Sequence, residues 1–146
     1  MDLPELTNFG SLIRYALLLE ASSASLYRTA AGWLAPGTQK DLARELSEQH
    51  ESRRTLLERT RQQKLNEMVL EPISGLEGAR YVFDADLASA ADIRPKALGV
   101  EEAGARLYAE SSLIAKSLLT EAARTLQKLA VENQRNLARL REAFPA

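Results

Sequence analysis

The chain contains no cysteine, which excludes disulfide bonds, cysteine-ligated iron–sulfur clusters and thiolate metal sites. It contains a single histidine, His50, and this excludes any catalytic or metal-binding scheme that needs two imidazoles. Only 7 glycines and 5 prolines occur among the 146 residues. Because both residue types disfavour helix interiors, their scarcity favours a helical protein.

Other absences limit the expected partners and compartment. No apolar run approaches the roughly 20 residues that span a bilayer, so we expect no membrane segment. The first ten residues, MDLPELTNFG, lack a basic stretch followed by an apolar one, so we expect no signal peptide and a cytoplasmic protein. The formal net charge is −1 and no basic patch interleaves with aromatic residues, so nucleic acid is not an expected partner.

Apolar residues make up 45% of the chain and charged residues 27%, as in an ordinary soluble domain. Helical spacing of the apolar residues predicts one all-α domain with four helices, over residues 7–34, 38–69, 96–115 and 120–144. Residues 70–95 then form a long crossover between the second and third helices. Short, long and short connections are typical of a ferritin-like four-helix bundle.

The crossover has two open interpretations. It is either a mobile loop or a segment packed on the bundle through Tyr81, Val82 and Phe83.

On the first helix, the side chains of Leu18, Leu19 and Trp33 extend the apolar surface beyond one stripe. A homodimer or another protein partner is the expected use of such a surface, unless the crossover covers it.

Two segments of the chain read as copies of each other. Glu20 precedes Tyr27 by seven positions, and 81 residues later Glu101 precedes Tyr108 by the same seven. At about 100° per residue, positions seven apart differ by only about 20° around a helix. Each glutamate therefore lies on the inward, apolar stripe of its helix.

The second and fourth helices also turn polar residues inward. His50 lies about 40° from the apolar position Leu46, and Arg53 lies about 20° away on the other side. The stripe of the fourth helix includes Asn133 and Asn136. The predicted inward polar set is therefore Glu20, His50, Arg53, Glu101, Asn133 and Asn136.

A rival register uses Glu51 and Glu132, each followed three positions later by an arginine. Glu51 falls about 140° from Leu46, among polar neighbours. The neighbours of Glu132 are polar as well. We therefore interpret both glutamates as parts of solvated faces.

At these residues the chain resembles the rubrerythrin-like branch of the ferritin-like superfamily. Family members carry a glutamate seven residues before a tyrosine on helices 1 and 3, as here at Glu20 with Tyr27 and Glu101 with Tyr108. On helices 2 and 4 they carry Glu-x-x-His, where this chain has His50 with Arg53 and Asn133 with Asn136. The resemblance implies a di-iron or di-manganese centre that handles oxygen or peroxide. Four of the six ligand positions that it implies are changed.

Arginine stays protonated and has no lone pair for a metal, but its planar guanidinium suits carboxylates. We therefore expect Arg53 to lie where the metals would be and to bond at least one of Glu20 and Glu101. The leading hypothesis is a ferritin-like bundle that has lost its di-metal site, has no catalytic residue or cofactor, and serves a structural or interaction role. A vacated site that binds a small ligand is a third interpretation.

The alternative hypothesis is a mononuclear Fe- or Mn-binding, oxidoreductase-like protein that uses Glu20, His50 and Glu101, a ligand set suited to either metal. His50 is otherwise a hydrogen-bonded core histidine. The tyrosines also have two interpretations. Tyr27 and Tyr108 are either redox-active neighbours of a metal or core residues whose hydroxyls a carboxylate satisfies.

Overall fold

The computed structural model describes residues 4–68, 73–115 and 120–146. These ranges hold four long helices, α1 (Phe9–Trp33), α2 (Thr38–Met68), α3 (Ile93–Ala115) and α4 (Thr120–Ala143), and two 3-10 helices, η1 (Gly78–Tyr81) and η2 (Ala90–Asp92). No strand occurs in them, so the prediction of an all-α protein with four helices is confirmed. None of the helices in these ranges is both long and apolar enough to cross a bilayer.

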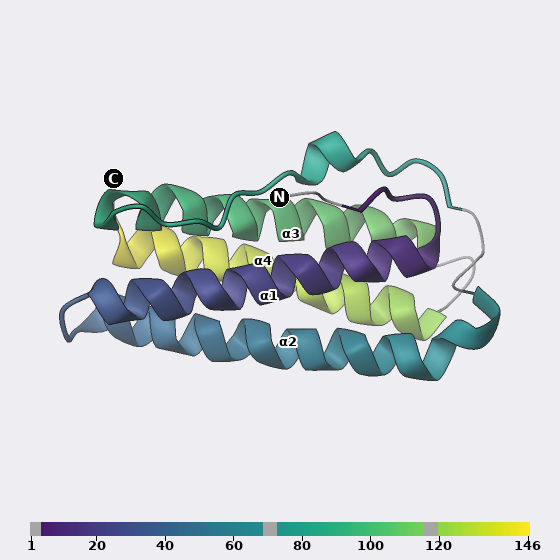
Figure 1. The fold of residues 1–146 in the computed structure, drawn as a ribbon, viewed down its shortest axis with the longest axis horizontal. Coiled ribbons are helices and arrows are strands. Elements are labelled where there is room, and N and C mark those ends of the chain that lie inside the picture. The colour runs from purple at the N-terminus through teal and green to yellow at the C-terminus, as the bar shows by residue number, and fades with distance from the viewer. Residues whose placement is uncertain (1–3, 69–72, 116–119) are drawn as a thin grey trace.

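The helices form two hairpins that lie side by side. Helix α1 packs mainly on α2, and α3 packs mainly on α4 (Figure 1). Helices α2 and α3 run in the same direction, so the chain between them must return along the length of the bundle (Figure 1). Each hairpin therefore presents one face to the other, and the inward side chains of all four helices meet there.

Local sequence explains where α1 and α3 begin. The side chain of Asn8 accepts a hydrogen bond from the Ser11 amide at 2.8 Å, and the Ser11 hydroxyl accepts one from the Asn8 amide at 3.0 Å, which starts α1 at Phe9. The third helix begins at Ile93, so the predicted start at Lys96 is wrong. Pro95 lies in the first turn of α3, where a helix needs no donor from it.

The crossover packs on the bundle over its described residues, 73–92. Tyr81 is buried, and the backbone carbonyl of Tyr81 accepts a hydrogen bond of 2.6 Å from the Tyr15 hydroxyl. Phe83 is buried with its ring edge-on to the ring of Tyr15, 6.2 Å between centroids. The prediction is wrong for Val82, which is 64% exposed. The chain is extended there, so successive side chains point to opposite sides.

The apolar surface expected on α1 is narrower than the sequence indicates. Leu19 is fully buried in the core, and Leu18 is half-buried against it. Only Trp33 stays open, with 47% of its surface exposed. This helix therefore offers one exposed aromatic residue instead of a broad apolar face.

Candidate functional site

The six inward polar residues meet in one layer of the bundle, and we call them the polar cluster. Each is at most 3% exposed, and they come from all four helices: Glu20 from α1, His50 and Arg53 from α2, Glu101 from α3, and Asn133 and Asn136 from α4. The helical phases therefore predicted the inward set correctly. Burial of four ionisable groups is expensive unless they are paired, so their contacts decide what the cluster does.

Glu20 is satisfied by three donors. Its Oε1 lies 2.5 Å from Nδ1 of His50. Its Oε2 accepts a hydrogen bond of 3.1 Å from Nη2 of Arg53 and one of 2.5 Å from the hydroxyl of Tyr108. Both carboxylate oxygens are therefore occupied by donors from α2 and α3.

Glu101 is satisfied by four donors. Its Oε2 lies 2.7 Å from Nε2 of His50 and accepts a 2.7 Å hydrogen bond from the hydroxyl of Tyr27. Its Oε1 accepts hydrogen bonds from the side-chain amides of Asn133, at 2.8 Å, and Asn136, at 2.9 Å. The asparagines at the changed ligand positions are donors to the carboxylate here.

His50 bridges the two glutamates, and this contact fixes its protonation state. An ionised carboxylate can only accept hydrogen bonds, so a ring nitrogen that bonds one must carry a proton. The pKa values of Glu20 and Glu101 are lowered, so both are ionised, and both ring nitrogens of His50 then donate as the doubly protonated imidazolium. The positive charges of His50 and Arg53 then balance the negative charges of Glu20 and Glu101, and the cluster is neutral overall.

Arg53 bonds Glu20, as expected, but not Glu101. Its Nη2 also donates a hydrogen bond of 2.8 Å to Oδ1 of Asn133, and its guanidinium carbon lies 5.4 Å from the centre of the Tyr108 ring. Asn133 therefore links Arg53 to Glu101, since its amide group accepts from one and donates to the other. The Nε and Nη1 atoms of Arg53 are buried, and no described residue forms a hydrogen bond with them.

The contacts stabilise every charged form in the cluster. Burial alone would raise the pKa of Glu101, but the positive charges of His50 and Arg53 lower it from 4.5 to about 2. The pKa of Glu20 is likewise lowered, because Arg53 and His50 outweigh burial. Burial alone would lower the pKa of His50, but Glu101 and Glu20 raise it from 6.5 to about 9. The pKa of Arg53 is raised by Glu20 against the effect of burial.

The two tyrosines are core residues with satisfied hydroxyls. Each donates to the glutamate of the opposite hairpin: Tyr27 of α1 to Glu101 of α3, and Tyr108 of α3 to Glu20 of α1. Burial, together with the bonded carboxylate, raises the pKa of both phenols well above 10. The copied Glu and Tyr positions therefore make the same reciprocal contact across the two hairpins.

The residues of the cluster do not fit a di-metal centre. Every carboxylate oxygen of Glu20 and Glu101 already accepts at least one hydrogen bond, and both nitrogens of His50 carry protons. Arg53 adds a fixed positive charge beside them. In the part of the chain that the structure describes, no three His, Cys, Asp or Glu side chains are grouped to hold a metal ion.

The rival register faces outward. Glu51 is half-exposed and forms an ion pair of 2.6 Å with Arg54 on the surface of α2. Glu132 is half-buried at the edge of α4 and takes no part in the hydrogen bonds of the cluster. The choice of His50 and Arg53 as the inward pair on α2 was therefore correct.

Two further residues support the cluster, and the sequence reasoning missed both. Gln49 exchanges hydrogen bonds with the side chain of Asn136, at 2.6 and 3.4 Å. Gly104 lies so close to Asn133 that an added Cβ would be 2.7 Å from Nδ2 of that residue. A glycine in a helix interior is unfavourable by itself, and this one was a signal of close approach.

We expect Gly104→Ala to destabilise the protein, because the new Cβ displaces Asn133 from Glu101 and Arg53. The loss should be about 1–3 kcal/mol, as for other overpacked sites. Gly99→Ala on the same helix is the matched control, since nothing lies within 4 Å of its added Cβ. The control should gain up to about 1 kcal/mol of helix stability. Urea denaturation of both variants measures the difference, and equal effects would show that Asn133 can move freely.

Stability should fall on both sides of a window between pH 4.5 and pH 6.5. The depressed pKa of Glu101 contributes stability that is present above its unfolded value near 4.5 and is lost as pH falls through about 2. The raised pKa of His50 contributes stability that is present below 6.5 and is lost as pH rises through about 9.

The loss of stability above pH 6.5 is the part of this prediction that is specific to His50, because the chain has no cysteine and no second histidine to titrate there. It should be on the order of 3 kcal/mol across this range. Urea denaturation at intervals from pH 5 to pH 10 measures it. Unchanged stability from pH 6.5 to pH 9.5 would show that His50 is not held as the imidazolium.

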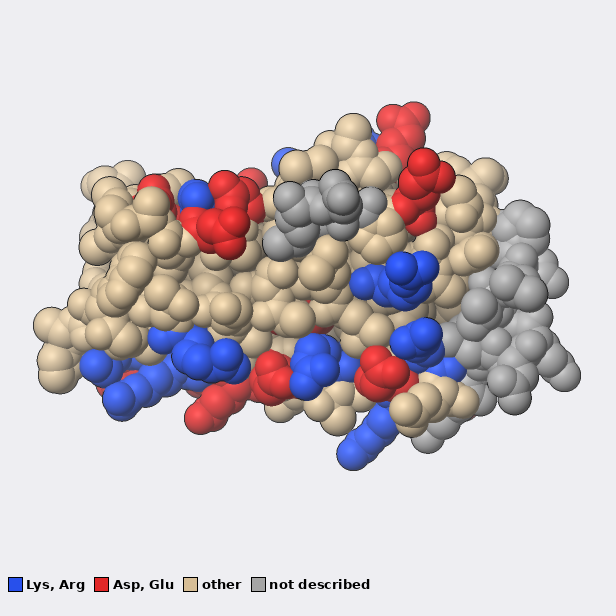
Figure 2. Space-filling view, in the orientation of Figure 1, with Lys and Arg blue, Asp and Glu red and all other residues tan. Residues whose placement is uncertain are grey.

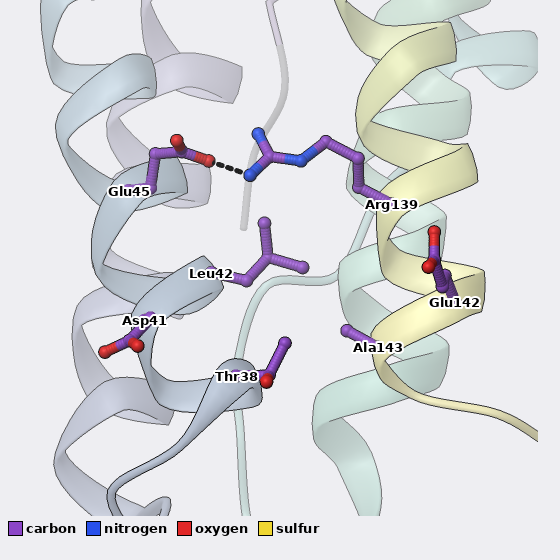
Figure 3. Close-up of a pocket in the computed structure, with 7 residues that line it drawn as sticks. All are labelled: Thr38, Asp41, Leu42, Glu45, Arg139, Glu142 and Ala143. Carbon is purple, nitrogen blue, oxygen red and sulfur yellow. Dashed lines mark ion pairs between the residues drawn. The ribbon is translucent and has the colours of Figure 1, made fainter.

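Outside the cluster, one hollow lies between the start of α2 and the end of α4 (Figure 3). Its carboxylates, Asp41, Glu45 and Glu142, are all exposed, and Glu45 forms an ion pair with Arg139 across the opening. It offers no buried ionisable group for chemistry among its lining residues. Comparison of the chain with family models, curated proteins and solved structures finds no match.

Proposed function

We propose that this protein is a ferritin-like bundle, similar to the rubrerythrin-like branch, in which the neutral polar cluster takes the place of a di-metal site. Such a protein performs no metal chemistry and serves a structural or interaction role. The observation that carries the proposal is the position of the His50 ring, with Nδ1 2.5 Å from Glu20 and Nε2 2.7 Å from Glu101, which favours the imidazolium over a metal-ligating ring. A metal bound to His50 in this layer would have to displace one ring proton and move Arg53 away.

Three further features support the ferritin-like assignment. The two hairpins are joined by a connection that returns along the bundle, as in ferritin-like topology (Figure 1). The residues Glu20 and Glu101 occupy equivalent positions, and each accepts from the tyrosine of the other hairpin. The positions that would supply Glu-x-x-His, on α2 and α4, face the same layer.

The competing function is a mononuclear Fe or Mn protein that uses Glu20, His50 and Glu101. These three side chains are already in contact, at 2.5 and 2.7 Å, and loss of one ring proton would give the neutral imidazole that ligates a metal. For that function the metal must bind more tightly than the one ring proton and the guanidinium that it replaces.

The test is metal binding by the unaltered protein. The chain is produced with excess iron or manganese, its metal content is measured, and its denaturation midpoint is compared with and without added Fe(II) or Mn(II). We expect substoichiometric metal and an unchanged midpoint, because an ion that does not bind the folded state cannot stabilise it. Stoichiometric metal that is lost in Glu101→Gln but kept in the surface control Glu51→Gln would support the mononuclear function instead.

A further inference from the structure

The two hairpins carry equivalent grooves on their outer sides. Glu20 and Glu101 relate α1 to α3 by 81 positions, and His50 and Asn133 relate α2 to α4 by 83 positions. Under these offsets, the groove between α1 and α2 that includes Gly32, Arg44 and Glu48 corresponds to the groove between α3 and α4 that includes Leu113, Gln127 and Val131. Each of these positions in one groove can therefore be compared with its counterpart in the other groove.

The groove between α1 and α2 is an ordinary solvated surface. Gly32 contributes no side chain to it, and Arg44 and Glu48 contribute charges of opposite sign. Charges of both signs also alternate along the α2 edge of the molecule (Figure 2). A partner that covered these charged side chains would therefore bury little apolar surface.

The groove between α3 and α4 is apolar at the same places. Leu113 stands where the other hairpin has Gly32, and Val131 stands where it has Glu48. These side chains are 72% and 40% exposed and line a hollow of about 620 Å³. Solvent-facing helix positions are normally polar, and exposed apolar side chains grouped in a hollow mark a binding surface.

The charge at this groove is of one sign. Arg124 and Lys128 line it, one turn apart on α4. Their counterparts in the other hairpin, Asp41 and Glu45, line the hollow of Figure 3 and not the α1–α2 groove. Within the described ranges neither cation forms an ion pair, whereas Glu45 is paired with Arg139. The α3–α4 groove therefore combines exposed apolar side chains with two cations that no described acidic side chain pairs.

We propose that the α3–α4 groove binds an amphipathic helix of a partner protein, with apolar side chains against Leu113 and Val131 and acidic side chains against Arg124 and Lys128. A groove between two helices accepts a third helix through apolar residues spaced three and four apart. A hollow favours this occupant over a flat lipid surface, which needs a broader set of apolar anchors. The inference rests on the proposed interaction role and names the surface that performs it.

The test uses a synthetic helical peptide of about 18 residues, roughly five turns, with leucines on one face and glutamates elsewhere. We expect saturable 1:1 binding in fluorescence anisotropy that weakens as salt rises. Leu113→Ser combined with Val131→Glu should reduce the affinity at least about tenfold, and Lys128→Glu should reduce it about tenfold. A peptide with lysines in place of the glutamates should not bind.

The matched control is Arg44→Glu, which makes a comparable charge change in the equivalent groove and should leave the affinity unchanged. No binding of the acidic peptide, or equal binding by all variants, would overturn the proposal. So would groove-dependent dimerisation in sedimentation equilibrium, or groove-dependent binding to vesicles of anionic lipid, since each assigns a different occupant. None of these outcomes alters the metal test, so failure of the groove and failure of the proposed function remain distinguishable.

Discussion

Replacement of Arg53 by alanine should lower the free energy of unfolding by about 3–5 kcal/mol. The change removes one of two cations that balance Glu20 and Glu101, and it also removes the donor that holds Oδ1 of Asn133. It leaves a buried layer with excess negative charge, and removal of one partner from a buried pair is strongly destabilising. Urea denaturation at pH 6 measures the loss.

Two variants separate charge from lost volume. Arg53→Met combined with Glu20→Gln and Glu101→Gln keeps the volume and removes the unpaired charge, so it should cost much less than Arg53→Ala. His50 can then lose one proton and remain hydrogen-bonded to the amides. Arg54→Ala is the surface control, because the side chains of its ion pair with Glu51 are 45% and 44% exposed and solvent screens such a pair strongly. Equal losses for the single and triple variants would mean that the charges are not coupled.

Four substitutions should convert the polar cluster into a di-metal site. The first pair, His50→Glu and Asn133→Glu, brings the carboxylates of the layer to four, together with Glu20 and Glu101. The second pair, Arg53→His and Asn136→His, supplies two imidazoles. The positions already face each other across the bundle, and Glu-x-x-His on two helices is the ligand pattern of di-metal carboxylate bundles. Calorimetry should show about two Fe(II), Mn(II) or Co(II) ions per chain, with none bound by the parent.

The same variant makes a prediction for stability. Without metal it should be less stable than the parent, because four carboxylates are crowded in a buried layer. Metal should restore the stability, because it binds only the folded state. The pair His50→Glu and Arg53→His alone is the matched control and should bind fewer ions. A quadruple variant that folds without taking up metal would contradict the ferritin-like assignment.

Periodicity predicted the number of helices and the membership of the polar cluster. The inward positions follow from about 100° per residue, so Glu20, Glu101 and the pairs on α2 and α4 could be placed without a structure. The limits of the helices were harder to predict. The start of α3 at Ile93 was missed, because Pro95 reads as a terminator unless the first-turn exception applies.

The ion pair of Arg53 with Glu20 was expected, but most contacts between helices could not be predicted from one sequence. Periodicity indicates that His50 points inward, but only the bundle places both of its ring nitrogens against carboxylates. The same holds for Gly104, whose role depends on how closely Asn133 approaches it. The exposed Leu113 was also missed, because a single apolar residue on a helix surface is common and becomes informative only beside Arg124, Lys128 and Val131.

The protonation state of His50 tests the central claim most directly. The chain has one histidine, so protein labelled with nitrogen-15 in that residue type gives the signals of one ring. We predict that the spectrum at pH 7 shows protons on both Nδ1 and Nε2, and that the ring titrates near pH 9. A neutral ring at pH 7, with one nitrogen bare, would contradict the account, because that nitrogen could not bond its carboxylate and would be free to bind a metal.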